Sequence, residues 1–264
     1  VWSICMDTDA NISMEPFRAL VADKLPEEQH TLGFSMQTLL IGIGAVIGSW
    51  LPYILGNWFG VSKEAASEGL VPPTVYISFY FGAAVLISSI IWTVVSTKEY
   101  PPEFYEDEED KHNSESSSLS KIKIPKTMWQ LLLVQFFSWF ALFSMWVFTT
   151  PAIAEHFYNS PDPNSRGYQE AGDWVGILFG IYNGVSAIIA LLLPKVARRI
   201  GRRATHAGAL TIGGLSFLSF AIIPNADLLI LPMIGIGIAW GSILAMPYAM
   251  LANSIPPKQM GVFM

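Results

Sequence analysis

Charge and cysteine are both scarce in this chain. Charged residues make up 14% of its 264 residues, against roughly 25% in an ordinary soluble domain. Because Cys5 is the single cysteine, an intramolecular disulfide, a CxxC redox motif and a cysteine-based zinc cluster are excluded. The net charge of -6 is spread over loops, and the basic residues form no patch of the kind that binds nucleic acid.

Apolar residues, in contrast, are abundant. They make up 52% of the sequence, and the mean hydropathy is +0.43. A bilayer crossing needs about 20 predominantly apolar residues. Runs of that length predict an all-α membrane protein with spans at 31–56, 73–96, 127–154, 174–197, 204–224 and 228–252. A seventh, more polar helix is predicted over 1–25, which makes seven transmembrane helices in all.

The distribution of Lys and Arg predicts the orientation of these helices. With Arg18 set aside as lying within a span, 12 basic residues fall on one side and only Lys63 and Arg166 on the other. The positive-inside rule makes the richer side cytoplasmic. The loops 98–126 and 198–203 are therefore predicted to be cytoplasmic, in the plasma membrane or, in a bacterium, the cell inner membrane.

The segment 98–126 differs from the rest in composition. It is rich in proline, serine and acids, which is typical of a solvated linker. We interpret its acidic run, 106–110, as part of that linker and not as a cation site. The linker separates three helices in 1–97 from four in 127–264. Because the chain begins with valine and stops at "QMGVFM", we expect an interior fragment of a longer protein.

Two helix ends six spans apart resemble each other. "PFRALVADKLPEEQ" at 16–29 and "PYAMLANSIPPKQ" at 247–259 share Pro-aromatic and Ala-[Asp/Asn]-x-[Leu/Ile]-Pro, with a gap of one residue. Both are predicted at the cytoplasmic end of a helix that runs from outside to inside. A parallel repeat of this period relates the two halves of major facilitator transporters. Chance similarity between helix ends is the alternative.

The opening helix carries charge where a membrane span avoids it. A charge at the bilayer centre costs about 2.5–3.5 kcal/mol on insertion scales, so such residues face a bundle interior or an aqueous cavity. Helical spacing places Asp7, Asn11 and Arg18 on one stripe, whereas Asp9 points nearly opposite to Asp7. Glu15 is placed to pair with Arg18, so a purely structural ion pair stays open for those two. A partly desolvated Asp7 suits a proton site, because burial raises the pKa of a carboxyl.

This helix also resembles a known family. It resembles the fourth helix of the proton-coupled sucrose transporters, within the glycoside–cation symporters of the major facilitator superfamily. Ala10 replaces an Asn of that family's motif, and Glu15 replaces a Gly. The residues that carry the resemblance are Asp7, Asn11, Pro16, Arg18, Ala19, Leu20, Ala22 and Asp23.

The resemblance implies a partial major facilitator fold, with helices four to ten of an expected twelve. It also implies that Asp7 is the proton site and that Arg18 is a partner of the substrate or of that carboxylate. Arg199-x-Gly201-Arg202-Arg203 resembles the superfamily's loop signature D-[RK]-x-G-R-[RK], although Arg198 stands where that signature has Asp. Structural or gating roles are accordingly predicted for Glu15, Asp23, Arg199, Gly201 and Arg202.

Further substrate-binding candidates lie in the second group of helices. Trp139 and Trp146 are seven residues apart, which places them on one helical face. Tyr182 and Asn183 lie amid small residues at mid-span, and Trp240 lies in a similar setting. A buried Asn in a membrane helix needs hydrogen-bond partners. Together these residues suit a sugar, which needs both hydrogen bonds and aromatic faces, although simple helix packing is the alternative.

Small-residue pairs and histidines have plainer interpretations. The glycine pairs Gly44-x-x-x-Gly48 and Gly237-x-x-x-Gly241 predict close helix approach. The four histidines have no metal-ligand spacing, so we interpret His30, His112, His156 and His206 as surface residues. No Ser–His–Asp set, phosphate-binding loop or dinucleotide fingerprint supports an enzyme.

These observations predict a secondary active transporter, not an enzyme. The expected activity is proton-coupled uptake of a sucrose- or maltose-like glycoside by alternating access. No cofactor or metal is expected beyond the coupling proton, with sodium as the alternative ion. The expected partners are the sugar and the lipid bilayer, with no nucleic acid, and the protein is expected to work as a monomer. A sensor that binds ligand without transport is the alternative from another class.

Overall fold

The computed structural model describes residues 18, 20–22, 24–62, 71–97 and 126–255. Over these residues the regular secondary structure is entirely helical. The α-helices are α2 (His30–Asn57), α3 (Pro73–Ser96), α4 (Lys126–Tyr158), α5 (Arg166–Ile200), α6 (Arg202–Ser219) and α7 (Ile230–Ala252). Short 3-10 turns lie at η1 (Glu27–Gln29), η6 (Phe220–Ile222) and η7 (Ala226–Leu229).

The predicted fold class is confirmed. Six helices in the described part of the chain are long and apolar enough to cross a membrane, and each coincides with a predicted span. The predicted seventh helix lies almost wholly outside the described residues. α4 and α5 are longer than their apolar runs. Each helix continues beyond the length needed to cross the hydrocarbon core of the bilayer, into polar turns such as Arg166–Asp173. Hydropathy locates the apolar part of a helix and not its ends.

The chain divides into two compact units, and each is described by itself. Residues 1–53 and 125–264 form the first unit, and residues 54–124 form the second. In the second unit α3 begins with Pro73 in its first turn, where the missing N–H of proline costs no helical hydrogen bond. Its apolar side chains are exposed, among them Trp92 and Val95. The predicted division at the 98–126 linker stays a prediction.

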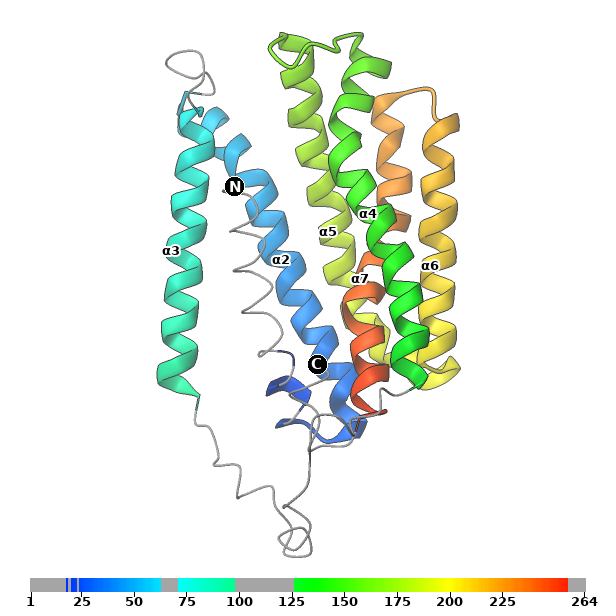
Figure 1. The fold of residues 1–264 in the computed structure, drawn as a ribbon. Helices are drawn as coiled ribbons and strands as arrows, with labels where there is room; N and C mark the ends of the chain where they lie inside the picture. The colour runs from blue at the N-terminus through cyan, green and yellow to red at the C-terminus, as the bar shows by residue number, and fades with distance from the viewer. Residues whose placement is uncertain (1–17, 19, 23, 63–70, 98–125, 256–264) are drawn as a thin grey trace, which may run out of the picture. The chain divides into compact units, whose positions relative to one another are not determined.

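In the first unit, α7 is the central helix of a group formed with α4, α5 and α6 (Figure 1). Within the most apolar window of α7, 72% of residues are buried, against 11% in α4. A helix that is apolar on all sides, as α7 is, belongs in such a central position. α6 packs on α7 through the stripe Thr205, Ala209 and Gly213, whose spacing of four residues keeps it on one face.

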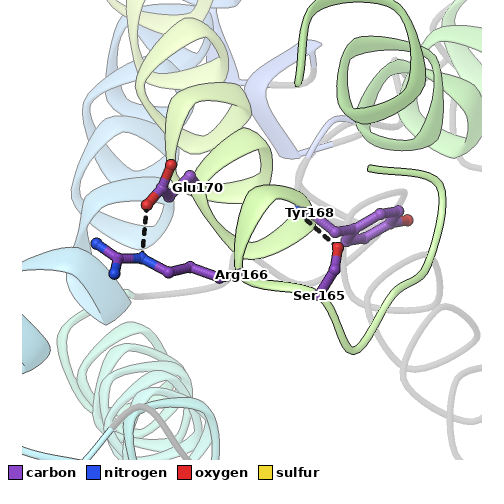
Figure 2. Close-up of polar contacts among 4 residues, drawn as sticks. All are labelled: Ser165, Arg166, Tyr168 and Glu170. Atoms are coloured by element: carbon purple, nitrogen blue, oxygen red, sulfur yellow. Dashed lines mark hydrogen bonds and ion pairs between the residues drawn. The ribbon is translucent and has the colours of Figure 1, made fainter. Parts of the chain in front are cut away.

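α5 has well-defined ends, which fix its position in the chain. Ser165 caps the first turn by accepting a hydrogen bond from the backbone N–H of Tyr168 at 3.2 Å, and Arg166 pairs with Glu170 one turn on at 2.9 Å (Figure 2). At the other end Gly201 adopts φ +86°, a conformation that favours glycine. The chain can therefore turn from α5 directly into α6.

Close approach between α5 and α7 depends on glycine. A Cβ atom at Gly237 would lie 2.5 Å from the carbonyl oxygen of Tyr182, and one at Gly241 would lie 3.1 Å from that of Ser186. The prediction of close packing is therefore confirmed for this pair. At Gly44 and Gly48 no described atom lies within 4 Å of a Cβ, so close approach there stays a prediction. Among the described residues, the same local pattern therefore meets a neighbouring helix in α7 and none in α2.

Gly237→Ala is expected to destabilise the protein. The added methyl group would clash with the backbone of α5, which cannot move aside as a flexible side chain does. Overpacking of this kind costs about 1–3 kcal/mol, so the midpoint of thermal unfolding in detergent should fall. Gly214→Ala in α6 is the control, because no described atom lies within 4 Å of its Cβ position. Equal midpoints for the two variants would contradict the packing role of Gly237.

Candidate functional site

Five predicted substrate-binding residues meet in the core of the first unit. Trp139 and Trp146 come from α4, Tyr182 and Asn183 from α5, and Trp240 from α7. We call these five residues the aromatic cluster. Tyr182, Asn183 and Trp240 are buried, whereas Trp139 and Trp146 are half-buried. Three helices that are separate in the sequence therefore bring their polar and aromatic mid-span residues to one place.

The three indole rings pack edge to face. Their centroids are 6.1 Å apart between Trp139 and Trp146, and 5.8 Å apart between Trp240 and each of the other two. Interplanar angles of 71–89° direct the positive ring edges toward negative ring faces, which is the favoured geometry for aromatic pairs. The indoles therefore hold one another in fixed orientations.

Hydrogen bonds tie the indoles to the polar residues of α5. The indole N–H of Trp146 donates to the hydroxyl oxygen of Tyr182 at 3.0 Å, and that of Trp240 donates to Oδ1 of Asn183 at 3.2 Å. Asn183 in turn donates from Nδ2 to the carbonyl oxygen of Phe179 at 2.9 Å. Buried polar groups need such partners, since an unpaired one is costly in a low-dielectric interior.

The aromatic cluster has the chemistry of a site for a polyhydroxylated ligand. The bond from Trp146 uses an acceptor site on the hydroxyl of Tyr182 and leaves that hydroxyl's own proton to donate elsewhere. The half-buried indoles of Trp139 and Trp146 offer flat apolar surface beside these polar groups. Pockets for small molecules combine apolar walls with a few placed polar groups in this way.

α2 passes directly beside the aromatic cluster. A Cβ atom at Gly42 would lie 2.9 Å from the carbonyl oxygen of Asn183, so the two backbones are in close contact there. Ile41 packs against the same buried core as Trp240. The aromatic cluster therefore lies next to a helix that comes before the 98–126 linker in the sequence.

Arg18 lies elsewhere. It is 4% exposed, and its guanidinium carbon lies 3.9 Å from the ring centroid of Tyr248, near the end of α7. Tyr248 follows Trp240 by eight residues, which is about 12 Å along a helix. The structure therefore places Arg18 on the aromatic face of Tyr248 and not in the aromatic cluster. Asp7, Asn11, Glu15 and Asp23 lie outside the described residues, so the predicted stripe and the Glu15–Arg18 pair stay predictions.

The basic loop between α5 and α6 makes contacts through one of its arginines. Arg202 donates from Nε to the hydroxyl of Thr31 at 2.7 Å and from Nη1 to the carbonyl oxygen of Ala249 at 3.2 Å. It thus joins the start of α6 to α2 and α7. Arg199 is exposed, and Gly201 provides the turn. Of the three predicted structural or gating residues in this loop, Arg202 contacts distant helices within the described part of the chain.

The prediction that the histidines are surface residues is wrong for two of them. His30 and His206 are 3% and 5% exposed, whereas His156 is exposed and His112 lies outside the described residues. His206 bonds through Nδ1 to the hydroxyl of Ser242 at 2.9 Å, between α6 and α7. Both buried rings lie near the start of a helix and pack against α7 or the residue that follows it, and a position near a helix end does not by itself reveal such a tertiary contact.

Sequence reasoning also missed two partners at the end of α7. Tyr248 stacks with Arg18, and Asn253 bonds to His30. Both residues belong to the repeated segment 247–259, so the repeat itself was the available signal. Among the described residues no group of three or more His, Cys, Asp or Glu side chains has the arrangement of a metal site.

The comparisons with known proteins agree with this architecture. The family model described as Major Facilitator Superfamily matches residues 11–264, which is most of the chain. Searches of curated proteins and of solved structures gave no significant match. The match runs through both groups of apolar helices, the basic loop at 198–203 and the repeated segment near the end. The chain belongs to the Major Facilitator Superfamily.

Proposed function

We propose that this membrane transporter takes up a sucrose- or maltose-like glycoside together with protons by alternating access. The superfamily supports transport in general. The observation that carries the sugar proposal is the aromatic cluster, in which three indoles pack around the hydrogen-bonded side chains of Tyr182 and Asn183. Sugars present hydroxyl groups at their edges and apolar C–H faces, and this set of side chains complements both.

The position of the aromatic cluster fits a site between two halves. α2 contributes Gly42 on one side, while α4, α5 and α7 contribute the aromatic and polar side chains on the other. In transporters built from repeats, substrates bind near the bilayer midplane at the interface of the repeats. Rocking of the halves around that point would expose the sugar first to one side of the membrane and then to the other.

Proton coupling is assigned to the opening helix. Asp7 would take a proton from outside and release it inside, and its polar stripe supports the assignment. Arg18 would act near the proposed cytoplasmic end, where its charge lies against Tyr248. The distribution of basic residues supports placing Arg202 and the 98–126 linker on the cytoplasmic side.

Uptake by the full-length protein in proteoliposomes tests this function. Radiolabelled sucrose and maltose are supplied outside, with an inward proton gradient, an inward sodium gradient or no gradient. We expect accumulation above the outside concentration with the proton gradient alone, and its loss when a protonophore is added. Accumulation with sodium alone would indicate sodium coupling, and sugar binding without uptake would indicate a sensor. Either result would overturn the proposal.

A further inference from the structure

We propose that residues 18–31 and 248–255, which overlap the two similar segments 16–29 and 247–259, form a latch that holds the basic end of the first unit closed, with His30 as its central hydrogen-bonding residue. The latch deepens the proposed function, because alternating access requires this end to open and close. The latch consists of hydrogen bonds, one cation–π contact and a cluster of buried apolar side chains beneath them, which we call the apolar floor. All of these contacts lie within the described residues.

His30 joins three points of the chain. Its Nε2 donates to the carbonyl oxygens of Ala22 at 3.1 Å and Leu25 at 3.0 Å, at the end of the preceding helical residues. Its Nδ1 lies 2.9 Å from Oδ1 of Asn253, which is 223 residues away in the sequence. Carbonyls at a helix end lack partners within their own helix. His30 satisfies two of them and reaches across to the end of α7.

The bond to Asn253 is available to both forms of the ring. When the ring is protonated, Nδ1 donates to Oδ1 of the amide. When the ring is neutral with its proton on Nε2, Nδ1 accepts from the amide nitrogen after the amide turns over. Because Asn can both donate and accept, the side chain at 253 can pair with Nδ1 in either role.

Two arginines add contacts on either side of this bond. Arg18 lies with its guanidinium 3.9 Å from the ring centroid of Tyr248, a cation–π distance. Arg202 reaches the hydroxyl of Thr31, beside His30, and the carbonyl oxygen of Ala249. Arg18 thus reaches α7 and His30 reaches the residue that follows it, while Arg202 of α6 bridges Thr31 to α7.

The apolar floor beneath these contacts combines five alanines with the larger side chains of Phe34, Leu193, Met246 and Ile255. A buried cluster at this end contains Ala22 and Phe34 from one side and Ala245, Ala249 and Ala252 from the other. Alanines allow close approach but bury little apolar area each. The alanines therefore let the two sides approach closely, so that the polar contacts above can form across them.

The repeat explains why these particular segments meet. Ala22 and Leu25 occupy the positions that Ala252 and Ile255 occupy in the second copy, and all four lie at this end of the unit. A pseudo-two-fold axis between parallel repeats brings equivalent segments together around itself. The latch therefore joins matching helix ends, so rocking of the halves would separate all of its contacts together.

Chemical labelling of the full-length protein tests the latch. Ala245→Cys, in a background where Cys5 and any other cysteine of the full-length protein are replaced by Ser, places a reporter thiol in the buried floor about 12 Å along α7 from Asn253. The rate of reaction with a membrane-impermeant maleimide is measured in open membrane fragments, without sugar or gradient. Asn253→Leu should raise the rate roughly five-fold, the effect expected for one lost hydrogen bond, and His30→Leu, which also loses the bonds to Ala22 and Leu25, should raise it at least as much. The double variant should not exceed His30→Leu, because that variant already lacks the bond to Asn253.

Controls keep this result interpretable. His156→Leu, at an exposed histidine of α4, should leave the rate unchanged. Size-exclusion chromatography checks that each variant is folded. Unchanged labelling in folded Asn253→Leu, or an equal rise in His156→Leu, would overturn the latch. Because neither sugar nor a proton gradient is used, the latch can stand where proton-coupled sugar uptake fails, and the reverse also holds.

Discussion

Asp7→Asn is expected to abolish proton-driven accumulation of sugar. The substitution keeps the size and hydrogen-bonding shape of the side chain but removes the carboxyl that would bind and release the coupling proton. A carboxyl in a partly desolvated cavity titrates nearer to neutral pH than one in water, whereas an amide does not titrate at all. The measurement is radiolabelled sugar uptake in proteoliposomes under an inward proton gradient, with the final inside-to-outside concentration ratio as the readout.

Asp9→Asn is the matched control for this prediction. Helical spacing directs Asp9 nearly opposite to Asp7, so the same chemical change two residues away should leave accumulation close to that of the unmodified protein. Exchange of sugar across the membrane without a gradient should persist in Asp7→Asn, because the variant can still bind sugar and its two halves can still rock. Undiminished accumulation in Asp7→Asn, or an equal loss in Asp9→Asn, would remove Asp7 from the coupling site.

Asn183→Leu is expected to weaken sugar binding by about ten-fold or more, since each factor of ten corresponds to about 1.4 kcal/mol. The leucine provides no acceptor for the indole N–H of Trp240 and no amide for a sugar hydroxyl. The unpaired indole would be free to turn out of the edge-to-face arrangement. The change in tryptophan fluorescence on titration with sugar measures the dissociation constant, because three indoles lie in the aromatic cluster.

Two further variants separate binding from folding. Tyr182→Phe removes the acceptor for Trp146 while keeping the ring, so it should weaken binding less than Asn183→Leu. Trp129→Phe, at an exposed tryptophan of α4, should leave sugar affinity unchanged. If folded Asn183→Leu binds sugar as the unmodified protein does, the aromatic cluster is helix packing and not a sugar site.

Local sequence patterns were sufficient to place the described helices. Each of the six spans found in the described residues follows from an apolar run, because the length of such a run reflects the thickness of the bilayer. The turn at Gly201 and the first residue of α3 at Pro73 also follow from residue type. The sequence did not predict where α4 and α5 end, because polar residues continue those helices beyond the apolar run.

The sequence predicted which residues belong to the candidate site but not how they are arranged. Spacing placed Trp139 and Trp146 on one face of α4, and their rings do lie together. That Asn183 accepts from Trp240 depends on how closely α5 packs on α7, which Gly237 permits. Helical periodicity describes the faces of one helix and carries no information on which helix lies opposite.

The sequence by itself determined the membrane-spanning helices, the polar opening stretch with Asp7 and the repeat between the two ends, because each depends on composition or spacing along the chain. Only the tertiary structure decided that His30 is buried against Asn253, and that Gly237 meets the backbone of α5. These outcomes depend on contacts between residues far apart in the sequence. Such contacts arise from packing among whole helices, which no local pattern specifies.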